Sequence, residues 1–269
     1  MKDTVLVNKM QRAKGRVSFH VKGEKITRLF QSGSSKLLLP KTYTPMREAV
    51  ILNTSGGIAG GDRVDIEIEA QNCPLTVTTQ AAERLYRSNT TAAKINIELI
   101  ASNNAVLHWL PQETIIFNKS KVDRNLNLRM FDDSSCLIAE TVILGRQAMG
   151  ENVCFCRFTD NWRIYCDEKL IHAESFRLDG NVEKIIASVV GSGGNSCLST
   201  IFYFNKDAEE KQSRLKKLSE GLDSTCATSF WGGKLLVRLL SKESLTGLSV
   251  FQNVVKELIG RPMPRVWPK

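Results

Sequence analysis

Apolar and polar residues alternate over several stretches of this chain. Within residues 62–70, valine or isoleucine alternates with acidic residues, and similar alternation recurs in residues 94–100 and 125–131. A two-residue period places the apolar side chains on one face of an extended strand and the polar side chains on the other. We therefore predict a half-buried β-strand at each of these three places.

Other segments carry continuous apolar or β-branched runs that also predict strands, at residues 114–117, 136–144, 153–158, 185–190 and 198–204. Turn-forming residues separate the strands at spacings of about ten residues, which is typical of an antiparallel all-β architecture. Residues 207–222 and 244–259 instead space apolar residues three or four apart and predict helices. We expect a mainly β fold of stacked antiparallel sheets with two late α-helices.

The composition is that of an ordinary globular protein. Of the 269 residues, 42% are hydrophobic and 24% are charged, which argues against disorder and against a coiled coil. The 37 basic and 28 acidic residues give a net charge of +9, which favours acidic partners. Because the basic residues are spread along the chain and aromatic residues make up only 7%, we expect no nucleic-acid binding. A basic nucleic-acid-binding module remains an alternative.

Further features bear on the compartment and on the domain organisation. The seven cysteines include no C-x-x-C pair, and a chain of this length needs no disulfide scaffold. The chain begins without the apolar stretch of a signal peptide, and no run approaches the roughly 20 apolar residues of a membrane helix. We expect a cytoplasmic protein without membrane association. No linker or repeat is visible, so we expect a single domain over residues 1–269, with residues 1–15 as a flexible N-terminal segment.

The glycine-rich segment at residues 56–62 is the most unusual stretch of the chain. Gly56 and Gly61 have the spacing of a phosphate-binding loop, but Asp62 stands where that loop requires lysine, and a carboxylate repels phosphate. A strand, not a helix, is predicted to follow. We therefore interpret the segment as a glycine turn with positive φ angles before a strand. An enzyme that binds a nucleotide or another small molecule through this segment remains the alternative.

Soft metal ligands are sparse in the sequence. His20, His108 and His172 lie far apart, and Cys154 with Cys156 supplies only two soft ligands, too few for a tetrahedral zinc site. No serine, histidine and acid arrangement predicts a hydrolase. We expect neither a catalytic residue nor a tightly bound cofactor.

Four carboxylates stand next to glycine, proline or a strand end and not in a solvated run; they are Asp62, Glu113, Glu140 and Glu151. Carboxylates suit hard or borderline divalent ions, and they release them readily when few act together. The alternative is that each carboxylate caps backbone N–H groups or pairs with Arg87 or Arg146.

Five motifs follow one another along the chain. They are GGIAGGD at residues 56–62, TTQAAERLYR at 78–87, WLPQETI at 109–115, ETVILGRQAMGE at 140–151 and RPMPRVW at 261–267. With these motifs the chain resembles, from about residue 16 to its end, the UreD (UreH) family of urease accessory proteins. The motif residues are Gly56, Gly57, Gly60, Gly61, Gln80, Tyr86, Arg87, Trp109, Pro111, Gln112, Gly145, Arg146 and Gly150.

The resemblance implies a non-enzymatic role in urease maturation. Members of the family bind the urease apoprotein (UreA, UreB and UreC) and recruit UreF and the GTPase UreG, which carries nickel. The complex delivers nickel to the buried active site of urease, and an internal water-filled passage is the route proposed for it. The resemblance also implies a β-rich fold, with stacked sheets in a helicoidal arrangement and two helices.

Two hypotheses join this resemblance to the chemistry of the residues. Nickel that crosses between proteins needs weak, oxygen-rich contacts, so we expect some of the four carboxylates to line a passage and to hold nickel only in transit. The glycines are expected to shape the turn that brings Asp62 inward. If the turn needs a positive φ angle at Gly60, Gly60→Ala should misfold or lose its partners.

The C-terminal end is a candidate surface for UreF. The predicted helix at residues 244–259 precedes Arg265 and Trp267, two residue types that commonly anchor interfaces. The alternative is that Trp267 packs the C-terminus onto the sheet.

Overall fold

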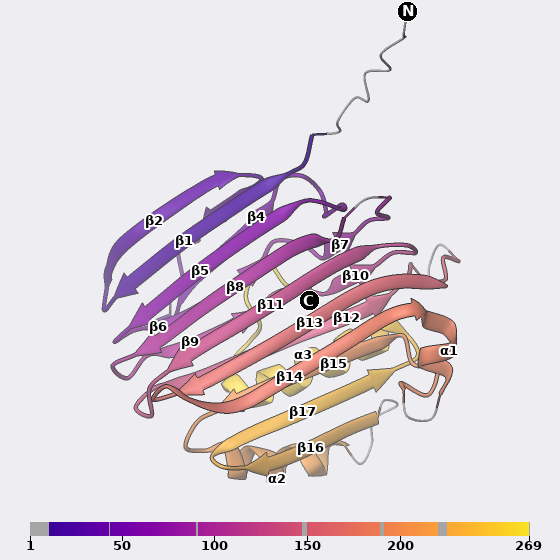
Figure 1. Cartoon of the computed structure of the whole chain (residues 1–269). Coiled ribbons are helices and arrows are strands. Elements are labelled where there is room, and N and C mark those ends of the chain that lie inside the picture. The colour runs from indigo at the N-terminus through magenta and orange to yellow at the C-terminus, as the bar shows by residue number, and fades with distance from the viewer. Residues whose placement is uncertain are drawn as a thin grey trace, which may run out of the picture.

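The computed structural model describes residues 11–42, 44–89, 91–146, 150–188, 191–219 and 225–268. Across these residues, two large β-sheets lie face to face, and helices cover the far face of one of them (Figure 1). The larger hydrophobic core lies between the two sheets. A smaller core lies between one sheet and the helices.

Sheet A has a polar outer face and an apolar inner face. Its strands, in spatial order, are β14 (Lys169–Asn181), β13 (Phe155–Cys166), β11 (Lys121–Met130), β8 (Ala93–Ser102), β5 (Arg63–Gln71), β1 (Lys14–Lys22) and β2 (Lys25–Gly33). Buried positions alternate with more exposed ones along β5, β8 and β11. The three half-buried strands predicted from alternation are therefore confirmed.

Sheet B packs against the inner face of sheet A. Its strands, in spatial order, are β16 (Thr225–Trp231), β17 (Lys234–Ser241), β15 (Cys197–Phe204), β12 (Ser135–Leu144), β9 (Val106–Leu110), β6 (Pro74–Thr79), β4 (Arg47–Asn53) and β3 (Ser35–Leu38). The short strands β7 (Glu83–Leu85) and β10 (Thr114–Ile116) extend this sheet beside β12. β12 is buried along nearly its whole length, because sheet A covers one of its faces and a helix contacts the other.

The chain winds back and forth between the sheets. From β4 to β13 the long strands fall alternately in sheet B and sheet A, so each return to a sheet runs in the same direction as the one before. Neighbouring central strands consequently pair in parallel. Antiparallel pairs join the strands at both ends of the stack. The β-rich class, the stacked sheets and their helicoidal winding are confirmed, whereas antiparallel pairing is wrong for the central strands.

The uncovered outer face of sheet A explains this error. Parallel sheets usually have both faces covered, so their strands read as continuous apolar runs, while one-sided alternation is typical of antiparallel sheets. Here the outer face of sheet A carries polar residues although its central strands are parallel. The alternation shows which face of a strand is exposed to solvent, and it carries no information about strand direction.

Helices α2 (Ala208–Ser219) and α3 (Ser244–Ile259) confirm the two predicted late helices. Both pack on the face of sheet B that points away from sheet A (Figure 1). α3 ends where Gly260 takes a left-handed conformation with φ of 64°. Residues 220–222, at the end of the first predicted helix, lie outside the described residues. None of the helices in the described ranges is long and apolar enough to cross a membrane.

A third helix, α1 (Val182–Ala187), occupies part of the segment predicted as a strand at residues 185–190, so that prediction is wrong for residues 185–187. The backbone N–H of Lys184 donates a hydrogen bond to Asn181 Oδ1 at 3.0 Å and thereby caps the helix. A short apolar run fits a buried strand or a helix equally well, and here the cap decides. Residues 189 and 190 lie outside the described residues.

The structure limits the predicted flexible N-terminal segment, because strand β1 already begins at Lys14. Residues 1–10 lie outside the described residues. Lys14 and Gly15 already belong to β1 and pair in parallel with β5, so the segment does not extend to residue 15. The backbone N–H of Ala13 donates to Asp62 Oδ1 at 2.8 Å, which fixes this end beside the glycine-rich turn.

The glycine-rich segment forms the predicted turn, and β5 follows it as expected. Gly56 and Gly61 have φ angles of 73° and 84°, in the region that favours glycine. Gly60 lies outside that region. A Cβ atom there would lie 1.7 Å from Ser88 Oγ and 2.7 Å from Thr91 O. Crowding, not a positive φ angle, therefore requires glycine at position 60, and the expected reason is corrected.

We expect Gly60→Ala to lower the free energy of unfolding by about 2 kcal/mol or more, because its methyl group would overlap Ser88 and the Thr91 carbonyl. Gly56→Ala is the matched control, since Gly56 has a positive φ angle but open space around it, and it should cost about 1 kcal/mol. Chemical denaturation of both variants measures the difference. A larger loss at Gly56 than at Gly60 would show that crowding is not the reason.

Candidate functional site

A polar cluster lies in the otherwise apolar space between the two sheets. Arg124 of β11 and Asp160 of β13 belong to sheet A, and Glu140 of β12 belongs to sheet B. All three residues are buried. β11 and β13 pair with Arg124 opposite Asp160, so the two side chains lie on the same face of sheet A. The cluster therefore joins the two sheets through charge.

The guanidinium of Arg124 contacts both carboxylates. Its Nε and Nη2 donate to the two oxygens of Asp160 at 2.9 and 2.6 Å, which is a two-point contact. Nη2 also lies 2.5 Å from Glu140 Oε2, and Nη1 donates to Thr114 Oγ1 at 3.2 Å. Every nitrogen of this buried cation thus has an oxygen neighbour.

Two tryptophans fix the carboxylates. Trp109 Nε1 donates to Glu140 Oε1 at 2.7 Å, and Trp162 Nε1 donates to Asp160 Oδ2 at 3.2 Å. Trp109 is the tryptophan of the WLPQETI motif, so this motif supports the cluster directly. Because indole N–H groups only donate, they hold the carboxylate oxygens without adding charge.

The cluster holds more negative than positive charge when both carboxylates are ionised. Burial raises the pKa of Glu140 above its usual value, and Arg124 opposes that rise. Burial also acts to lower the pKa of Arg124, but Asp160 and Glu140 outweigh it and raise that pKa. Arg124 therefore stays charged and is shared by two acids. Excess negative charge in a dry interior attracts cations strongly.

A small cavity of about 30 Å³ adjoins the cluster. Its polar lining includes Glu140, Asp160, Glu174 of β14 and Thr200 of β15. The cavity has room for about one water molecule or one small ion. Carboxylates from both sheets therefore face a space of ionic size.

A second hollow, of about 200 Å³, lies beside the glycine-rich turn, and Glu83 lines it together with Asn53 and Gly57. Asn53 Nδ2 donates to the two oxygens of Glu83 at 3.1 and 3.2 Å. Burial raises the pKa of Glu83 to about 7. Glu83 stands opposite Thr114 in the pairing of β7 with β10, and Thr114 accepts the hydrogen bond from Arg124. Thr114 is therefore the strand partner of Glu83 and also a hydrogen-bond partner of the cluster.

Of the four carboxylates predicted from the sequence, Glu140 alone belongs to the cluster. Asp62 accepts hydrogen bonds from two backbone N–H groups, both at 2.8 Å, and therefore caps the glycine-rich turn. Glu151 pairs with Arg146 at 2.6 Å, so both of these acids follow the alternative interpretation. Glu113 is half-buried, and burial raises its pKa, but it lines neither hollow. The structure does not bring the four together.

Sequence reasoning missed Arg124, Asp160 and Glu83. A signal existed for the first two, since each occupies the apolar phase of an alternating strand, with apolar residues two places before and after it. A charged residue in that phase points into the core and needs a partner there. Glu83 gave no such signal, because its strand is only three residues long.

The motif residues near the C-terminus tie the tail to sheet B. Gln112 Nε2 donates to Gln80 O at 2.8 Å and to a carbonyl of the tail at 3.0 Å. Trp267 is buried, stacks on a phenylalanine of α3 with 5.7 Å between ring centres, and donates to Thr78 Oγ1 at 3.0 Å. Trp267 therefore follows the packing alternative and is not an exposed anchor. Arg265 is exposed.

The remaining motif residues shape turns. Tyr86 Oη donates to Gly56 O at 3.2 Å, and its ring fills the space that a Cβ atom at Gly57 would need. Gly145 and Gly150 have φ angles of 77° and 67°. The other two are the exposed Arg87 and the half-buried Pro111.

Histidines and cysteines assemble no metal centre in the described ranges, where no three His, Cys, Asp or Glu side chains form a group that could hold a metal ion. His108 is buried with Nδ1 at 2.8 Å from Arg261 Nη2, and burial lowers its pKa to about 3. Cys156 is buried, whereas Cys154 Sγ lies 3.3 Å from a glutamate oxygen. A metal ion bound within the described residues would therefore have fewer than three His, Cys, Asp or Glu ligands.

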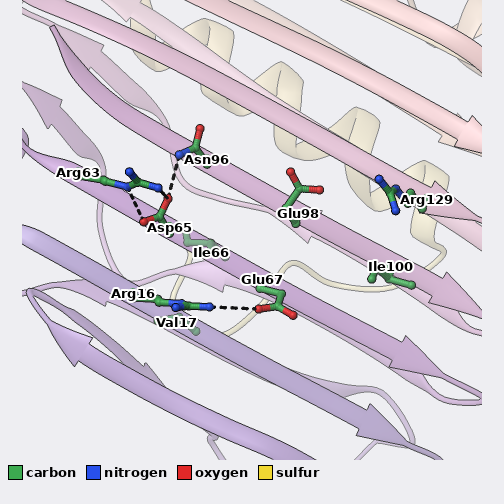
Figure 2. A pocket seen from close by; sticks show the side chains of 10 residues that line it. All are labelled: Arg16, Val17, Arg63, Asp65, Ile66, Glu67, Asn96, Glu98, Ile100 and Arg129. Atoms are coloured by element: carbon green, nitrogen blue, oxygen red, sulfur yellow. Dashed lines mark hydrogen bonds and ion pairs between the residues drawn. The ribbon is translucent and has the colours of Figure 1, made fainter.

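A wider hollow of about 510 Å³ lies on the outer face of sheet A (Figure 2). Its charges pair with one another there, Arg63 with Asp65 at 2.7 Å and Arg16 with Glu67 at 3.9 Å. Such exposed ion pairs are screened by water and contribute little energy. We therefore place the candidate site in the interior, at Arg124 and its carboxylates.

Comparison with known proteins shows the family. The model of the UreD urease accessory protein family matches residues 11–268. Urease accessory protein UreD of Rhizobium leguminosarum bv. viciae is 37% identical over 263 residues, 96% of each chain. The proteins of the same name from Chelativorans sp. (strain BNC1) and Agrobacterium fabrum are 38% and 34% identical over 265 residues, 96% of this chain and 95% and 92% of theirs. These names describe an accessory protein and not a catalytic enzyme. The chain belongs to the UreD urease accessory protein family.

Proposed function

We propose that this protein is a scaffold for urease maturation, which binds the urease apoprotein (UreA, UreB and UreC) with UreF and UreG and guides nickel into the urease active site. Family membership supports the maturation role. The observation that carries the nickel part is the buried cluster of Arg124, Glu140 and Asp160, because a scaffold without catalysis has no other evident need for two acids in its core. Nickel is the cargo and not a resident cofactor.

The polar side chains follow one line through the space between the sheets. The line begins at Glu83 beside the glycine-rich turn, passes Thr114 and Arg124, and continues to Glu140 and the cavity lined by Glu174. Most of the other buried residues between the two sheets are apolar. Apart from Arg124 itself, every residue named on this line offers a side-chain oxygen to a divalent ion.

Arg124 makes this line of side chains suitable for the passage of nickel and unsuitable for holding it. Its guanidinium already contacts both oxygens of Asp160 and one oxygen of Glu140, so a metal ion reaches them only in competition with a positive charge. A few carboxylates hold a borderline ion far more weakly than thiolate and imidazole ligands do. When Glu140 is ionised, the cluster has an excess negative charge that favours entry, and Arg124 opposes retention.

Glu83 suits the entrance of the line because its pKa lies near neutrality. At a pKa of about 7 the carboxyl group is partly protonated in neutral solution. A cation that arrives releases this proton, and the proton returns when the cation leaves. The release of one proton per divalent ion limits the rise in charge of the half-buried site to one unit instead of two.

Glu140→Gln tests the nickel route. The substitution removes one negative charge but leaves Arg124 paired with Asp160, so the fold and the partner complex should survive. We expect nickel-dependent urease activation to fall by about tenfold or more, a loss typical of altered metal surroundings. Urease activity is measured after co-expression with the urease subunits, UreF and UreG in the presence of nickel. Glu24→Gln, in the exposed turn between β1 and β2, is the matched control.

Two outcomes would contradict the proposal at different levels. Equal urease activity with and without this protein would remove the maturation role itself. Normal activation by Glu140→Gln, with the partner complex intact on co-purification, would remove the nickel route and leave the scaffold role.

Glu83 predicts a pH dependence of stability. Its pKa is about 7 in the folded protein against an ordinary value of 4.5, so the folded state binds more protons between these values. The stability that the neutral carboxyl provides is therefore full below about pH 4.5 and is lost as the pH rises through about 7. We compare the free energy of unfolding of Glu83→Gln with that of the wild type. This difference should shift in favour of Glu83→Gln by up to about 3 kcal/mol when the pH rises from 5 to 8.

Denaturant unfolding at both pH values measures this gain, and Glu24→Gln serves again as the control. A difference between Glu83→Gln and the wild type that stays the same at both pH values would show that the carboxyl does not titrate in this range.

A further inference from the structure

Arg238 of β17 spans the gap between the two sheets beside the small cavity. Its Nη1 donates to Thr200 Oγ1 at 3.0 Å, and its Nη2 donates to Glu174 Oε2. Thr200 belongs to sheet B and Glu174 to sheet A, and both line the cavity. Arg238 therefore holds together two polar groups of the cavity wall.

Strand register explains this position. Glu140, Thr200 and Arg238 stand opposite one another across β12, β15 and β17, so they form one row on the same face of sheet B. Sheet A ends at β14, whereas sheet B continues through β17 and β16 (Figure 1). The side chain of Glu140 is 4% exposed and that of Arg238 is 45% exposed. The row thus runs from the dry interior to water.

A buried histidine points at the same carboxylate. His172 Nε2 lies 3.8 Å from Glu174 Oε2, too far for a hydrogen bond, and has no hydrogen-bond partner within the described part of the chain. The His172 side chain is only 7% exposed, and its ring packs beside Phe202 and Trp231. Buried polar atoms are almost always satisfied, so this nitrogen calls for an explanation.

We propose that His172, Glu174 and Thr200 form a transient divalent-cation site that Arg238 keeps closed. An imidazole nitrogen, a carboxylate oxygen and a hydroxyl suit a borderline ion such as Ni²⁺, and so small a set releases it readily. While Arg238 is in place, its guanidinium takes the two oxygens. When it swings into solvent, both oxygens lose this partner, the Glu174 oxygen still lies 3.8 Å from His172 Nε2, and a positive charge leaves.

Arg238 is suited to this movement and Arg124 is not. The Arg238 side chain is 45% exposed, so water replaces its lost contacts when it moves, and an incoming cation compensates the charge of Glu174, which is 13% exposed. Removing a buried cation such as Arg124 from its carboxylates leaves unpaired charge in the core. An acidic group on a partner docked at this edge would compete with Glu174 for Arg238 and so open the site on contact. The inference rests on the proposed function, because it places a controlled opening at one end of the same polar line.

Titration calorimetry of the purified full-length protein with Ni²⁺ tests the proposal. We expect Arg238→Ala to bind Ni²⁺ about tenfold more tightly than the wild type, because a competing charge is removed from the ligands. Arg238→Gln keeps most of the side chain and should show the same gain if Arg238→Ala fails to fold. Arg63→Ala is the matched control, since Arg63 is also a half-exposed, ion-paired arginine but lies on the outer face of sheet A (Figure 2).

His172→Phe identifies the site. Phenylalanine keeps the aromatic packing beside Phe202 and Trp231 but removes the nitrogen, so His172→Phe in the Arg238→Ala background should abolish the gain in affinity. Unchanged affinity in both Arg238 variants would overturn the proposal. An equal gain in Arg63→Ala, or a gain that survives His172→Phe, would overturn it as well.

This test is independent of the urease assay. Calorimetry uses the isolated protein, whereas the proposed function is judged by urease activation. If Arg238 has no effect on Ni²⁺ binding while Glu140→Gln still loses activation, the closed site is wrong and the nickel route stands. If Arg238→Ala gains affinity while Glu140→Gln activates urease normally, the site stands and the route through Glu140 is wrong.

Discussion

The alternation of successive strands between two sheets is the constraint on which this structure depends. Because the chain returns to each sheet in the same direction, central strands stack in parallel and their side chains align in rows. Rows on the inner faces meet the other sheet and must be apolar or mutually paired. Arg124 of sheet A pairs with Glu140 of sheet B. Strand register also places Thr200 and Arg238 in the same row as Glu140. Winding thus determines where buried charge is allowed.

Buried charge on this scale is not explained by stability. Replacing a buried ion pair with well-packed apolar residues is often neutral or stabilising, whereas removing one partner typically costs about 3–5 kcal/mol. The fold could therefore be built with an apolar residue at each position of the cluster, as it is in the rows on either side. The presence of one buried cation with two buried acids therefore argues that these charges serve a function. Hydrogen bonds from Trp109 and Trp162 hold the two carboxylates in a fixed geometry.

Much of the fold, and less of the site, could be predicted from the sequence. Period-two alternation located strands such as β5 and β8, and helical spacing located α3, because each pattern reflects burial along a single element. Parallel pairing could not be predicted, since strand direction depends on the winding between sheets and not on any one strand. Glu140 was found as a motif residue, but its partners Arg124 and Asp160 lie 16 residues before it and 20 after it and meet it only in the folded chain. The capping role of Asp62 could not be decided from the sequence, because a capping carboxylate and a metal-binding one look alike there.

The tie between the C-terminal tail and sheet B sets the order in which the molecule can be completed during synthesis. Trp267 contacts Thr78 across 189 residues, and the core beneath α3 includes residues of β9 and β12 made much earlier. Until α3 and the tail have been made, the apolar far face of β9 and β12 lacks the cover that these segments provide. Contacts of such long separation form late, and exposed apolar sheet surface promotes aggregation. The nascent chain therefore exposes this apolar surface at least while the 99 residues between β12 and α3 are made.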